Sequence, residues 1–377
     1  MTSTDNRPPD GRGGATTDTS TASAKSGAAA HGRAAKGPEA SAPEAVKSPI
    51  TSPAGTAKNP LLSWKLLAGF IGVALLLVVS LFTGVYDVFG GDGGAEMFQI
   101  TRVPRTIALV LSGAAMAMCG LVMQLLTQNR FVEPTTTGTT EWAGLGLMLT
   151  VIIYPDASIL ARMIGAVFAA FIGTLVFFLF LRRVSLKSSL IVPIVGIMLG
   201  AVVGAVVGAI STFIAVQTDM LQSLGIWFAG SFTSILRGQY EILWVVVIVV
   251  IAVFITADRF TVAGLGKEVA TNVGVNYSQI ILIGTILVAT ATGIVTVVVG
   301  SLPFLGLIVP NVVSMIRGDD LRSNLPWVCL LGIAIVTICD LIGRIIIMPF
   351  ELPVSVILGV VGAAVFVGLL LRQRKRG

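Results

Sequence analysis

The chain has 377 residues, of which 55% are hydrophobic and only 12% are charged, and its mean hydropathy is +0.92. Soluble domains carry about 25% charged residues, so this composition excludes a water-soluble globule for most of the chain. The long uncharged runs predict an all-α polytopic membrane protein, because they are too continuous for the strands of a membrane barrel. The net charge of +6 arises from basic residues at the ends of the apolar runs, which indicates membrane topology rather than a nucleic-acid interface.

Residues 1–60 are polar and contain seven prolines, twelve of the 44 charged residues (25 basic plus 19 acidic) and no Leu, Phe, Trp or Tyr. Such a segment cannot bury enough apolar surface to offset its ordering entropy. It also lacks the short apolar core of a secretory signal. We expect a disordered cytoplasmic tail, with a regulatory or docking arm as the alternative, followed by a membrane domain at 61–377.

Five uncharged runs predict the first five membrane-spanning helices, each of which needs about 20 apolar residues. They are Leu66–Tyr86, Thr106–Asn129, Trp142–Pro155, Met163–Leu181 and part of Ser188–Thr218. The third run is short, contains glycine and ends in proline, which favours a broken helix. A half-length amphipathic segment at Met220–Gly230 is expected to lie at the outer surface.

Five further spans bring the total to about ten. They are predicted at Ile242–Ala257, from Ser278 to about Val299, as a short element from near Leu302, at Pro326–Ile347 and at Leu352–Leu371. The uncharged run at 278–316 is divided in two because Gly300, Pro303 and Pro310 interrupt it. The polar interval Asp258–Tyr277 is long enough for one or two short surface helices.

The basic residues favour an orientation with both termini in the cytoplasm, because Lys and Arg accumulate on that side of a membrane. With an even number of spans, fourteen basic residues flank the cytoplasmic ends. Five lie on the other side, and these are Arg102, Arg105, Arg162, Arg237 and Arg344.

A four-residue repeat of glycine marks the fifth predicted span. It consists of Gly196, Gly200, Gly204 and Gly208. Glycine at this spacing forms a shallow groove that admits the backbone of a neighbouring helix. The groove is a site of tight packing or a surface along which helices slide during transport, and both interpretations place this helix inside the bundle.

The residues that the chain lacks restrict its chemistry. It contains no G-x-x-x-x-G-K-[ST] phosphate loop, so we expect that it does not hydrolyse ATP itself. The single histidine, His31, lies in the polar tail, and Cys119, Cys329 and Cys339 lack metal-ligand spacing. We therefore expect neither catalytic residues nor a metal or other cofactor, and interpret the cysteines as small packing residues.

Ion-coupled carriers and intramembrane enzymes carry ionisable residues within the membrane. The clearest example in this chain is Asp340, followed one turn later by Arg344, and an i, i+4 ion pair would satisfy both charges. A passive channel, a carrier and an intramembrane enzyme acting on lipid remain alternatives. The favoured interpretation is a transporter whose energy comes from a partner.

Several ordered motifs extend along the membrane domain. They include R-V-P-R-T at 102–106, S-G-A-A at 112–115, Q-N-R at 128–130, E-P at 133–134, G-L-G-K-E-V-A at 264–270, F-L-G-L-I-V-P at 304–310 and E-L-P at 351–353. Together they resemble the FecCD family of permeases, the membrane subunits of ABC importers for iron siderophores, haem and vitamin B12. The resemblance covers the chain from Trp64 onward. It implies a type II importer fold of ten helices that pairs with a second permease subunit, identical or homologous, and a translocation path along their interface.

The resemblance also assigns candidate contact residues for two soluble partners. Coupling helices that dock into the ATPase subunits are matched by Gly266, Lys267, Glu268, Val269, Ala270 and Gly274, although Lys267 replaces a residue that is often acidic or small. An ordinary surface turn is the alternative there. Arginines that meet acidic residues of an extracytoplasmic substrate-binding protein are matched by Arg102, Arg105 and Arg344. Anchoring at the membrane surface is the alternative for these.

The cargo class rests on the segment E-P-T-T-T-G-T-T-E-W-A-G-L-G at 133–146. This form resembles the branch of the family that serves ferric siderophores, and haem or a cobalamin remains the alternative. The resemblance thus implies a multi-pass permease of the cytoplasmic membrane, powered by a separate ATPase, that imports a ferric siderophore.

Overall fold

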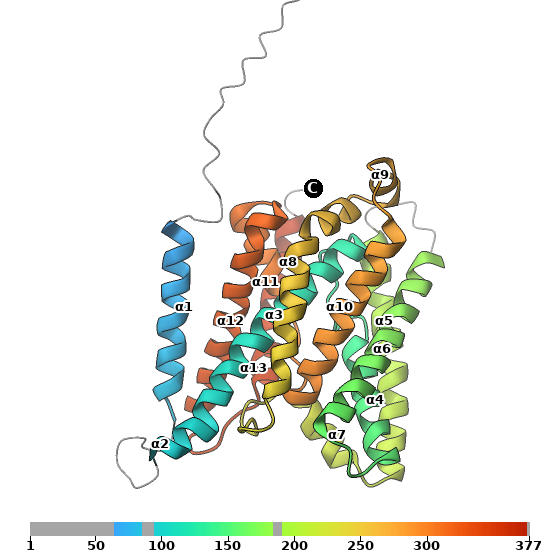
Figure 1. The fold of residues 1–377 in the computed structure, drawn as a ribbon. Helices are drawn as coiled ribbons and strands as arrows, with labels where there is room; N and C mark the ends of the chain where they lie inside the picture. The colour runs from blue at the N-terminus through green and yellow to red at the C-terminus, as the bar shows by residue number, and fades with distance from the viewer. Residues whose placement is uncertain (1–63, 85–93, 184–190, 375–377) are drawn as a thin grey trace, which may run out of the picture. The chain divides into compact units, whose positions relative to one another are not determined.

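The computed structural model describes residues 64–84, 94–183 and 191–374, and this part of the chain is helical without strands (Figure 1). The tail expected at 1–60 lies outside the described residues. In chain order the longer helices are α1 (Trp64–Phe82), α3 (Val103–Thr127), α4 (Thr139–Ile153), α5 (Ile159–Arg183), α6 (Ile191–Gln217), α8 (Trp244–Gly264), α10 (Tyr277–Val298), α11 (Leu305–Arg317), α12 (Leu321–Ile345) and α13 (Val354–Arg374). Short elements lie between them: α2 (Gly94–Met97), the π-helical turn η2 (Phe98–Arg102), α7 (Leu221–Phe228), the 3₁₀ turn η3 (Glu241–Leu243) and α9 (Lys267–Asn272).

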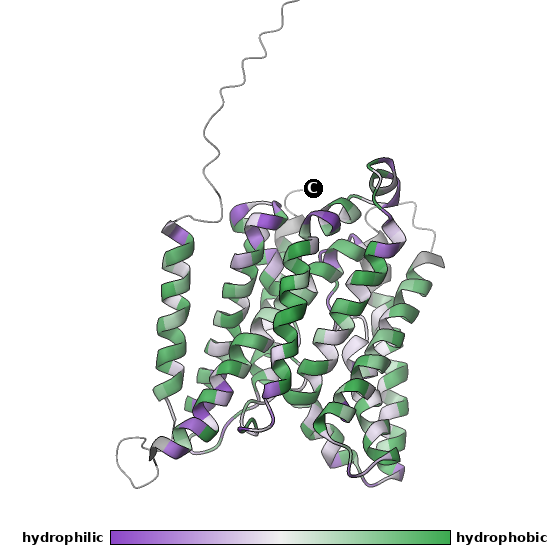
Figure 2. Cartoon of the chain, viewed as in Figure 1, coloured by the Kyte–Doolittle hydropathy of each residue, from purple (hydrophilic) through white to green (hydrophobic). Residues whose placement is uncertain are grey.

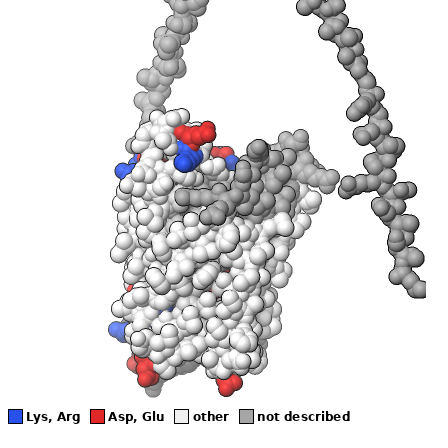
Figure 3. Space-filling model, turned by 90° about the vertical axis from the view of Figure 1, so that its right-hand side faces the viewer, with Lys and Arg blue, Asp and Glu red and all other residues white. Residues whose placement is uncertain are grey.

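Among the described residues, seven helices are long and apolar enough to cross a membrane, and α4, α11 and α13 supply three shorter apolar helices. These ten coincide in order with the ten spans predicted from the sequence, which confirms the all-α membrane class. Apolar residues cover the length of the helices, and hydrophilic residues gather at the two ends of the bundle (Figure 2). A space-filling view likewise shows the charged residues of one face at its two ends, separated by a wide uncharged band (Figure 3).

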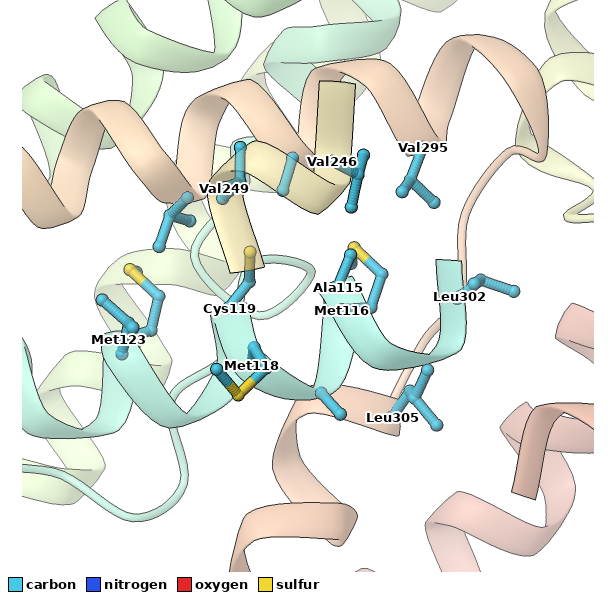
Figure 4. Close-up of a cluster of buried hydrophobic side chains, with 14 of the residues drawn as sticks. Ala115, Met116, Met118, Cys119, Met123, Val246, Val249, Val295, Leu302 and Leu305 are labelled. Atoms are coloured by element: carbon cyan, nitrogen blue, oxygen red, sulfur yellow. The ribbon is translucent and has the colours of Figure 1, made fainter. Parts of the chain in front are cut away.

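Helix α3 is the centre of the bundle and packs against α8, α10, α11 and α12. Of the most apolar window in its span, 78% is buried inside the chain. Met116, Met118, Cys119 and Met123 are all buried and form part of one continuous apolar cluster (Figure 4). The unbranched methionine side chains fill the irregular spaces between helices that cross at different angles.

Glycines allow the backbones of neighbouring helices to meet α3 directly. A Cβ atom on Gly120 would lie 2.0 Å from the carbonyl oxygen of Gly306 on α11. A Cβ atom on Gly332 of α12 would lie 2.5 Å from the carbonyl oxygen of Gly113. Helix association in lipid depends on close packing, because lipid tails are as apolar as leucine. These two contacts therefore fix α11 and α12 against α3.

Two long helices lie at the periphery of the described bundle. Only 6% of the apolar window of α1 is buried within the chain, and only 22% of that of α6. The exposed face of α6 carries the large apolar side chains of Met198, Val202, Val206, Ile210 and Phe213. The expectation that α6 lies inside the bundle is therefore not met within a single chain.

Helix α8 is longer than the sequence suggested. It continues from the predicted end at Ala257 to Gly264, and so includes the first seven residues of the interval taken as a surface connection. Asp258 and Arg259 make this stretch polar, but Phe260 and Ala263 are buried and continue the apolar face of the helix. The connection itself is reduced to α9 and its flanking turns.

Proline marks the helix boundaries less strictly than expected. Pro310 lies within α11, and α12 begins at Leu321, ahead of Pro326. Because proline has no N–H group, Pro310 leaves the carbonyl oxygen of Gly306 without its helical partner. The side-chain amide of Gln124 on α3 donates a hydrogen bond to that oxygen at 3.2 Å. A buried side chain thus replaces the missing backbone bond.

Candidate functional site

Helix α9 contains the residues predicted to dock on the ATPase subunits. Most of its residues are exposed, and it stands clear of the bundle at one end (Figure 1). Lys267, Glu268 and Val269 are exposed, whereas Ala270 is fully buried and anchors the helix. Its N-cap is Gly266, with φ +106°, and Gly274 follows its end with φ +83°.

The end of α9 has a defined hydrogen-bonded cap. The N–H of Gly274 donates to the carbonyl of Thr271 at 3.0 Å, and the N–H of Val275 donates to that of Ala270 at 2.9 Å. This is the Schellman arrangement, which requires a left-handed residue at the position that Gly274 occupies. The predicted coupling residues therefore form one compact, well-defined unit of surface structure.

An apolar stripe extends the surface of α9 beyond the residues predicted from the sequence. Leu265, Val269 and Val273 are spaced four residues apart and are 64%, 41% and 66% exposed. Val269 and the C-cap residue Val273 share one face of α9. Leu265 caps the end of α8 and is separated from α9 by Gly266, whose backbone is not helical. The three side chains leave apolar surface exposed on and beside α9. The four-residue spacing of these apolar residues is visible in the sequence, but the polar residues between them made the segment read as an ordinary polar connection.

The opposite end of the bundle carries the three predicted arginines, and the structure brings them together. Arg105 of α3 reaches both Asp340 of α12 and Glu351, which lies in the segment between α12 and α13. One guanidinium nitrogen lies 2.7 Å from an oxygen of each carboxylate, and a second donates to Glu351 at 3.2 Å. Arg105 is thereby held between two carboxylates and is only 11% exposed.

Arg344 and Arg102 complete this arginine cluster. Arg344 is buried and pairs with Asp340, which confirms the ion pair predicted from the i, i+4 spacing. It also donates to the carbonyl oxygens of Ser80 at 2.9 Å and Thr83 at 3.0 Å at the end of α1. Arg102 donates to the same carbonyl of Thr83. Contact with a binding protein requires an accessible side chain, and Arg344 is buried in this conformation.

A cavity of about 280 Å³ lies beside the cluster, with Arg102, Arg105, Thr233 and Glu351 in its wall. Partial burial raises the pKa of Glu351, but the hydrogen bond and charge of Arg105, together with the charge of Arg344, outweigh it and hold this pKa below its usual value. Glu351 is thus stabilised in its ionised form. Arg102 forms no ion pair with the described residues, so it contributes the positive charge that the carboxylates of this cluster leave uncompensated.

The glycine repeat of α6 faces a neighbour over only part of its length. A Cβ atom on Gly200 would lie 1.9 Å from the carbonyl oxygen of Thr136, and one on Gly204 would meet Gly138 and Glu141 at 3.8 Å. A Cβ atom on Gly208 would meet nothing within 4 Å. Because an α-helix has 3.6 residues per turn, each step of four residues rotates the repeat by about 40°, which turns the later glycines away from the contact. Gly196 lies where side-chain surroundings are not described.

Two carboxylates, one buried and one half-buried, were missed when Asp340 was taken as the clearest ionisable residue within the membrane. Glu133 is 1% exposed and accepts hydrogen bonds from the backbone N–H groups of Phe304 at 2.8 Å and Leu307 at 3.0 Å. Glu141 has a buried carboxylate oxygen without a partner. The signal was present in the sequence, since both residues stand between the second and third predicted spans, but their position suggested an exposed loop.

The cysteines lie in apolar surroundings. Cys119 and Cys339 belong to the main buried cluster, Cys329 packs against it, and all three are free thiols. Within the described residues, no group of three or more His, Cys, Asp and Glu side chains is arranged to hold a metal ion.

Comparison with known proteins places this architecture in a family. The model of the FecCD transport family matches residues 61–372. The petrobactin import system permease protein FatD of Bacillus anthracis is 59% identical over 326 residues, which cover 86% of this chain and 96% of that protein. The petrobactin import system permease protein YclN of Bacillus subtilis is 40% identical over 311 residues, covering 81% of this chain and 97% of that protein.

The fold has a counterpart among solved structures. A structure described as an inward-facing conformation of a metal-chelate type ABC transporter superposes with a TM-score of 0.69 at 23% identity, covering 82% of this chain and 99% of its own. At that identity the structural match supports only the arrangement of the helices, whereas the sequence matches show the family relationship. This multi-pass, all-helical membrane protein belongs to the FecCD transport family.

Proposed function

We propose that this chain is the membrane-spanning permease subunit of an ATP-driven importer that carries a ferric siderophore into the cytoplasm. The observation that carries the proposal is the 59% identity to a petrobactin import permease over almost the whole length of that protein. A permease named for ferric-anguibactin transport, from Vibrio anguillarum, is also 37% identical over 73% of this chain. Relatives named for siderophore import thus favour a siderophore over haem or a cobalamin.

The energy for transport comes, in this proposal, from separate ATPase subunits that dock on α9. The exposed apolar stripe of Leu265, Val269 and Val273 supports this role, because it offers a partner a surface to bury. Lys267 and Glu268 add charges of opposite sign beside the stripe, which favour one orientation of the partner. The chain itself contains no phosphate loop, so ATP binding belongs to that partner.

An extracytoplasmic substrate-binding protein docks at the arginine cluster in this proposal. Arg102 supplies the accessible positive charge, and the pairing with Asp340 and Glu351 holds Arg105 in position beside it. An acidic side chain of the binding protein would enter the adjoining cavity and accept hydrogen bonds from Arg102. Arg344 acts by fixing Asp340, because its own side chain is buried.

The orientation follows from the same assignment. The end of the bundle that carries α9 is cytoplasmic, and the arginine cluster lies on the outer side, which places both termini in the cytoplasm. A second permease subunit, identical or homologous, packs on the exposed face of α6. The exposed apolar side chains of that face, of which Phe213 is 66% exposed, support this contact.

The test is transport by the reconstituted complex in vesicles. The chain is combined with its ATPase subunits and binding protein, and ATP hydrolysis and uptake are measured with ferric siderophores, haem and cobalamin. We expect hydrolysis and uptake to be stimulated by a ferric siderophore. Stimulation by haem or cobalamin alone would overturn the cargo assignment.

An ion-coupled carrier is the second candidate, and one further condition separates it from the importer. Vanadate blocks the ATPase, whereas a protonophore collapses the proton gradient. Uptake that stops with vanadate and survives the protonophore supports the importer. The reverse pattern would assign the transport energy to the ion gradient.

A further inference from the structure

The loop 128–138 between α3 and α4 contacts three helices that are remote in the sequence. Its first residue, Gln128, lies beside Gly266 at the start of α9, where a Cβ atom would be 3.4 Å from the side-chain nitrogen of Gln128. Glu133 in its middle bonds to the first turn of α11. The carbonyl oxygen of Thr136 lies against Gly200 of α6. The loop is thus a junction between the surface helix α9 and two membrane helices.

The carboxylate of Glu133 acts as the N-terminal cap of α11. One of its oxygens accepts the N–H of Phe304 at 2.8 Å and the other that of Leu307 at 3.0 Å. The first N–H groups of a helix have no partner within it, and the helix dipole favours a negative charge there. Phe304, the N-cap residue itself, gives no side-chain hydrogen bond. A residue 171 positions earlier in the chain therefore satisfies the start of α11.

The backbone conformation of Phe304 is unfavourable by itself and depends on contacts such as the hydrogen bond with Glu133. Its φ of +63° is left-handed, which costs a residue with a side chain about 1–2 kcal/mol. Such a conformation persists only where surrounding contacts determine it. The bond from the Phe304 N–H to Glu133 is one of those contacts, and the hydroxyl of Thr135 holds the same carboxylate oxygen at 2.6 Å.

A second tie joins the loop to α11 one turn further along. The side-chain amide of Asn311 donates to the carbonyl oxygen of Arg130 at 2.7 Å, and also to that of Leu307 at 2.7 Å. Arg130 and Glu133 are therefore both bonded to α11. Loop and helix form one unit, so a displacement of the loop carries the start of α11 with it.

A cavity of about 350 Å³ lies between the end of α8 and α11, with Gly264 and the C-cap residue Leu265 on one side and Asn311 and Ser314 of α11 on another. Gln128 and Arg130 of the loop also lie in its wall. The loop therefore runs along this cavity from the base of α9 to α11, and it is one path by which motion at α9 reaches α11.

We propose that Glu133 is a positioning residue that links α9 to α11, so that movement of α9 shifts the start of α11 during transport. This inference rests on the proposed function, because it takes α9 as the site where the ATPase acts. Nothing in the role requires Glu133 to contact the cargo. Its effect is on the coupling between hydrolysis and uptake.

The test compares two isosteric substitutions of carboxylates, Glu133→Gln and the control Glu141→Gln, in the complete complex in vesicles. Glutamine at 133 keeps one acceptor oxygen but presents an NH₂ group to the second backbone N–H. Cargo uptake and ATP hydrolysis are measured together, and their ratio is the readout. A merely structural role would lower the amount of folded complex, and with it both rates, without changing the ratio.

We expect Glu133→Gln to lower uptake per ATP by about tenfold, because glutamine offers one acceptor oxygen in place of two and leaves one backbone N–H of α11 without its partner. Glu141→Gln is expected to keep the ratio within about twofold of the unmodified chain, because its buried oxygen has no partner to lose. An unchanged ratio in Glu133→Gln, or an equal fall in Glu141→Gln, would overturn the proposal. Absence of ATP-dependent uptake by the unmodified chain would instead overturn the proposed function.

A second variant keeps the proposal testable if Glu133→Gln does not fold. Gln128 is exposed and has φ +51°, so Gln128→Gly relieves the left-handed conformation while it removes the side chain beside Gly266. We expect this variant to fold at least as stably and to lose uptake per ATP in the same direction. A ratio equal to that of the unmodified chain would contradict the proposed path through the loop.

Discussion

Arg105 and Asp340 lie 235 positions apart in the sequence and form an ion pair of 2.7 Å that joins α3 to α12. Asp340 is 1% exposed, and its other oxygen binds Arg344. One carboxylate thus balances parts of two guanidinium charges, and Glu351 supplies the second negative charge. The arginine cluster is therefore a structural element as well as the proposed docking site, and the two roles can be separated by mutation.

Asp340→Asn is expected to destabilise the protein strongly. It leaves Arg344 buried without a carboxylate partner, and removal of one member of a buried ion pair costs about 3–5 kcal/mol. Thermal unfolding in detergent measures the effect. The control is Asp258→Asn, which breaks an exposed pair with Arg322 at 3.0 Å and should cost no more than about 1 kcal/mol. Equal unfolding temperatures for the two variants would contradict a buried network.

Arg102→Glu is expected to weaken docking of the binding protein without a comparable loss of stability. Arg102 lies in the wall of the outer cavity and forms no ion pair with the described residues, so its charge is available to a partner. The effect should be larger at low salt, because salt screens exposed charges. Affinity for the binding protein at two salt concentrations measures it. Arg237→Glu makes the same charge change at an exposed position at the same end and serves as the control.

The apolar stripe of α9 is expected to be necessary for retention of the ATPase. Val269→Asp with Val273→Asp places two charges on a surface that the partner would bury, which should abolish co-purification. Leu236→Asp changes an exposed apolar residue elsewhere and is expected to leave it intact. Retention of the ATPase by the double variant would move the coupling surface away from α9.

Substitution of the predicted coupling residues gives an independent test of the same surface. Lys267→Ala, Glu268→Ala and Gly274→Pro together remove both charges and the Schellman cap, because proline cannot adopt φ +83° or donate to Thr271. We expect the ATPase to be lost and uptake to stop. Coupled hydrolysis and uptake in this triple variant would show that these residues are not the coupling site.

The glycine repeat of α6 predicts two opposite results for one substitution. Gly200→Ala places a Cβ atom 1.9 Å from the carbonyl oxygen of Thr136, so α6 must separate from the loop, at a cost of about 1–3 kcal/mol. Gly208→Ala meets nothing within 4 Å and gains about 1 kcal/mol in helix propensity. Thermal unfolding of the two variants distinguishes them. Destabilisation by Gly208→Ala would reveal a neighbour at that position in the assembled complex.

Glu351 gives the arginine cluster an acid-dependent stability. The pairing with Arg105 holds the pKa of Glu351 below its unfolded value of about 4.3. Its contribution is therefore fully present above that unfolded value and is lost as the pH falls through the lower folded value. Unfolding temperatures of the unmodified chain and Glu351→Gln, measured from neutral pH into the acid range, should differ at neutral pH and converge in acid. A constant difference would contradict the ion pair with Arg105.

The positions of the helices could be predicted from the sequence because each span depends on a continuous run of apolar residues. The apolar runs did not predict the ends of the helices correctly, because tertiary contacts compensate there for residues that are unfavourable in a membrane helix. Pro310 remains within α11 because Gln124 bonds to the carbonyl that it leaves free. Phe260 and Ala263 extend α8 because their side chains are buried against other helices.

The sequence by itself determined the membrane class, the order of ten helices and the family. These follow from composition, periodicity and short motifs, which are local along the chain. Only the tertiary structure decided that Arg344 is buried, that α6 lies at the edge of the chain, and that Glu133 caps a helix 171 positions away. Burial and hydrogen bonding depend on which distant segments pack together. That packing depends on the shapes of the helix surfaces in three dimensions, for example where Gly120 lets the backbone of Gly306 approach closely.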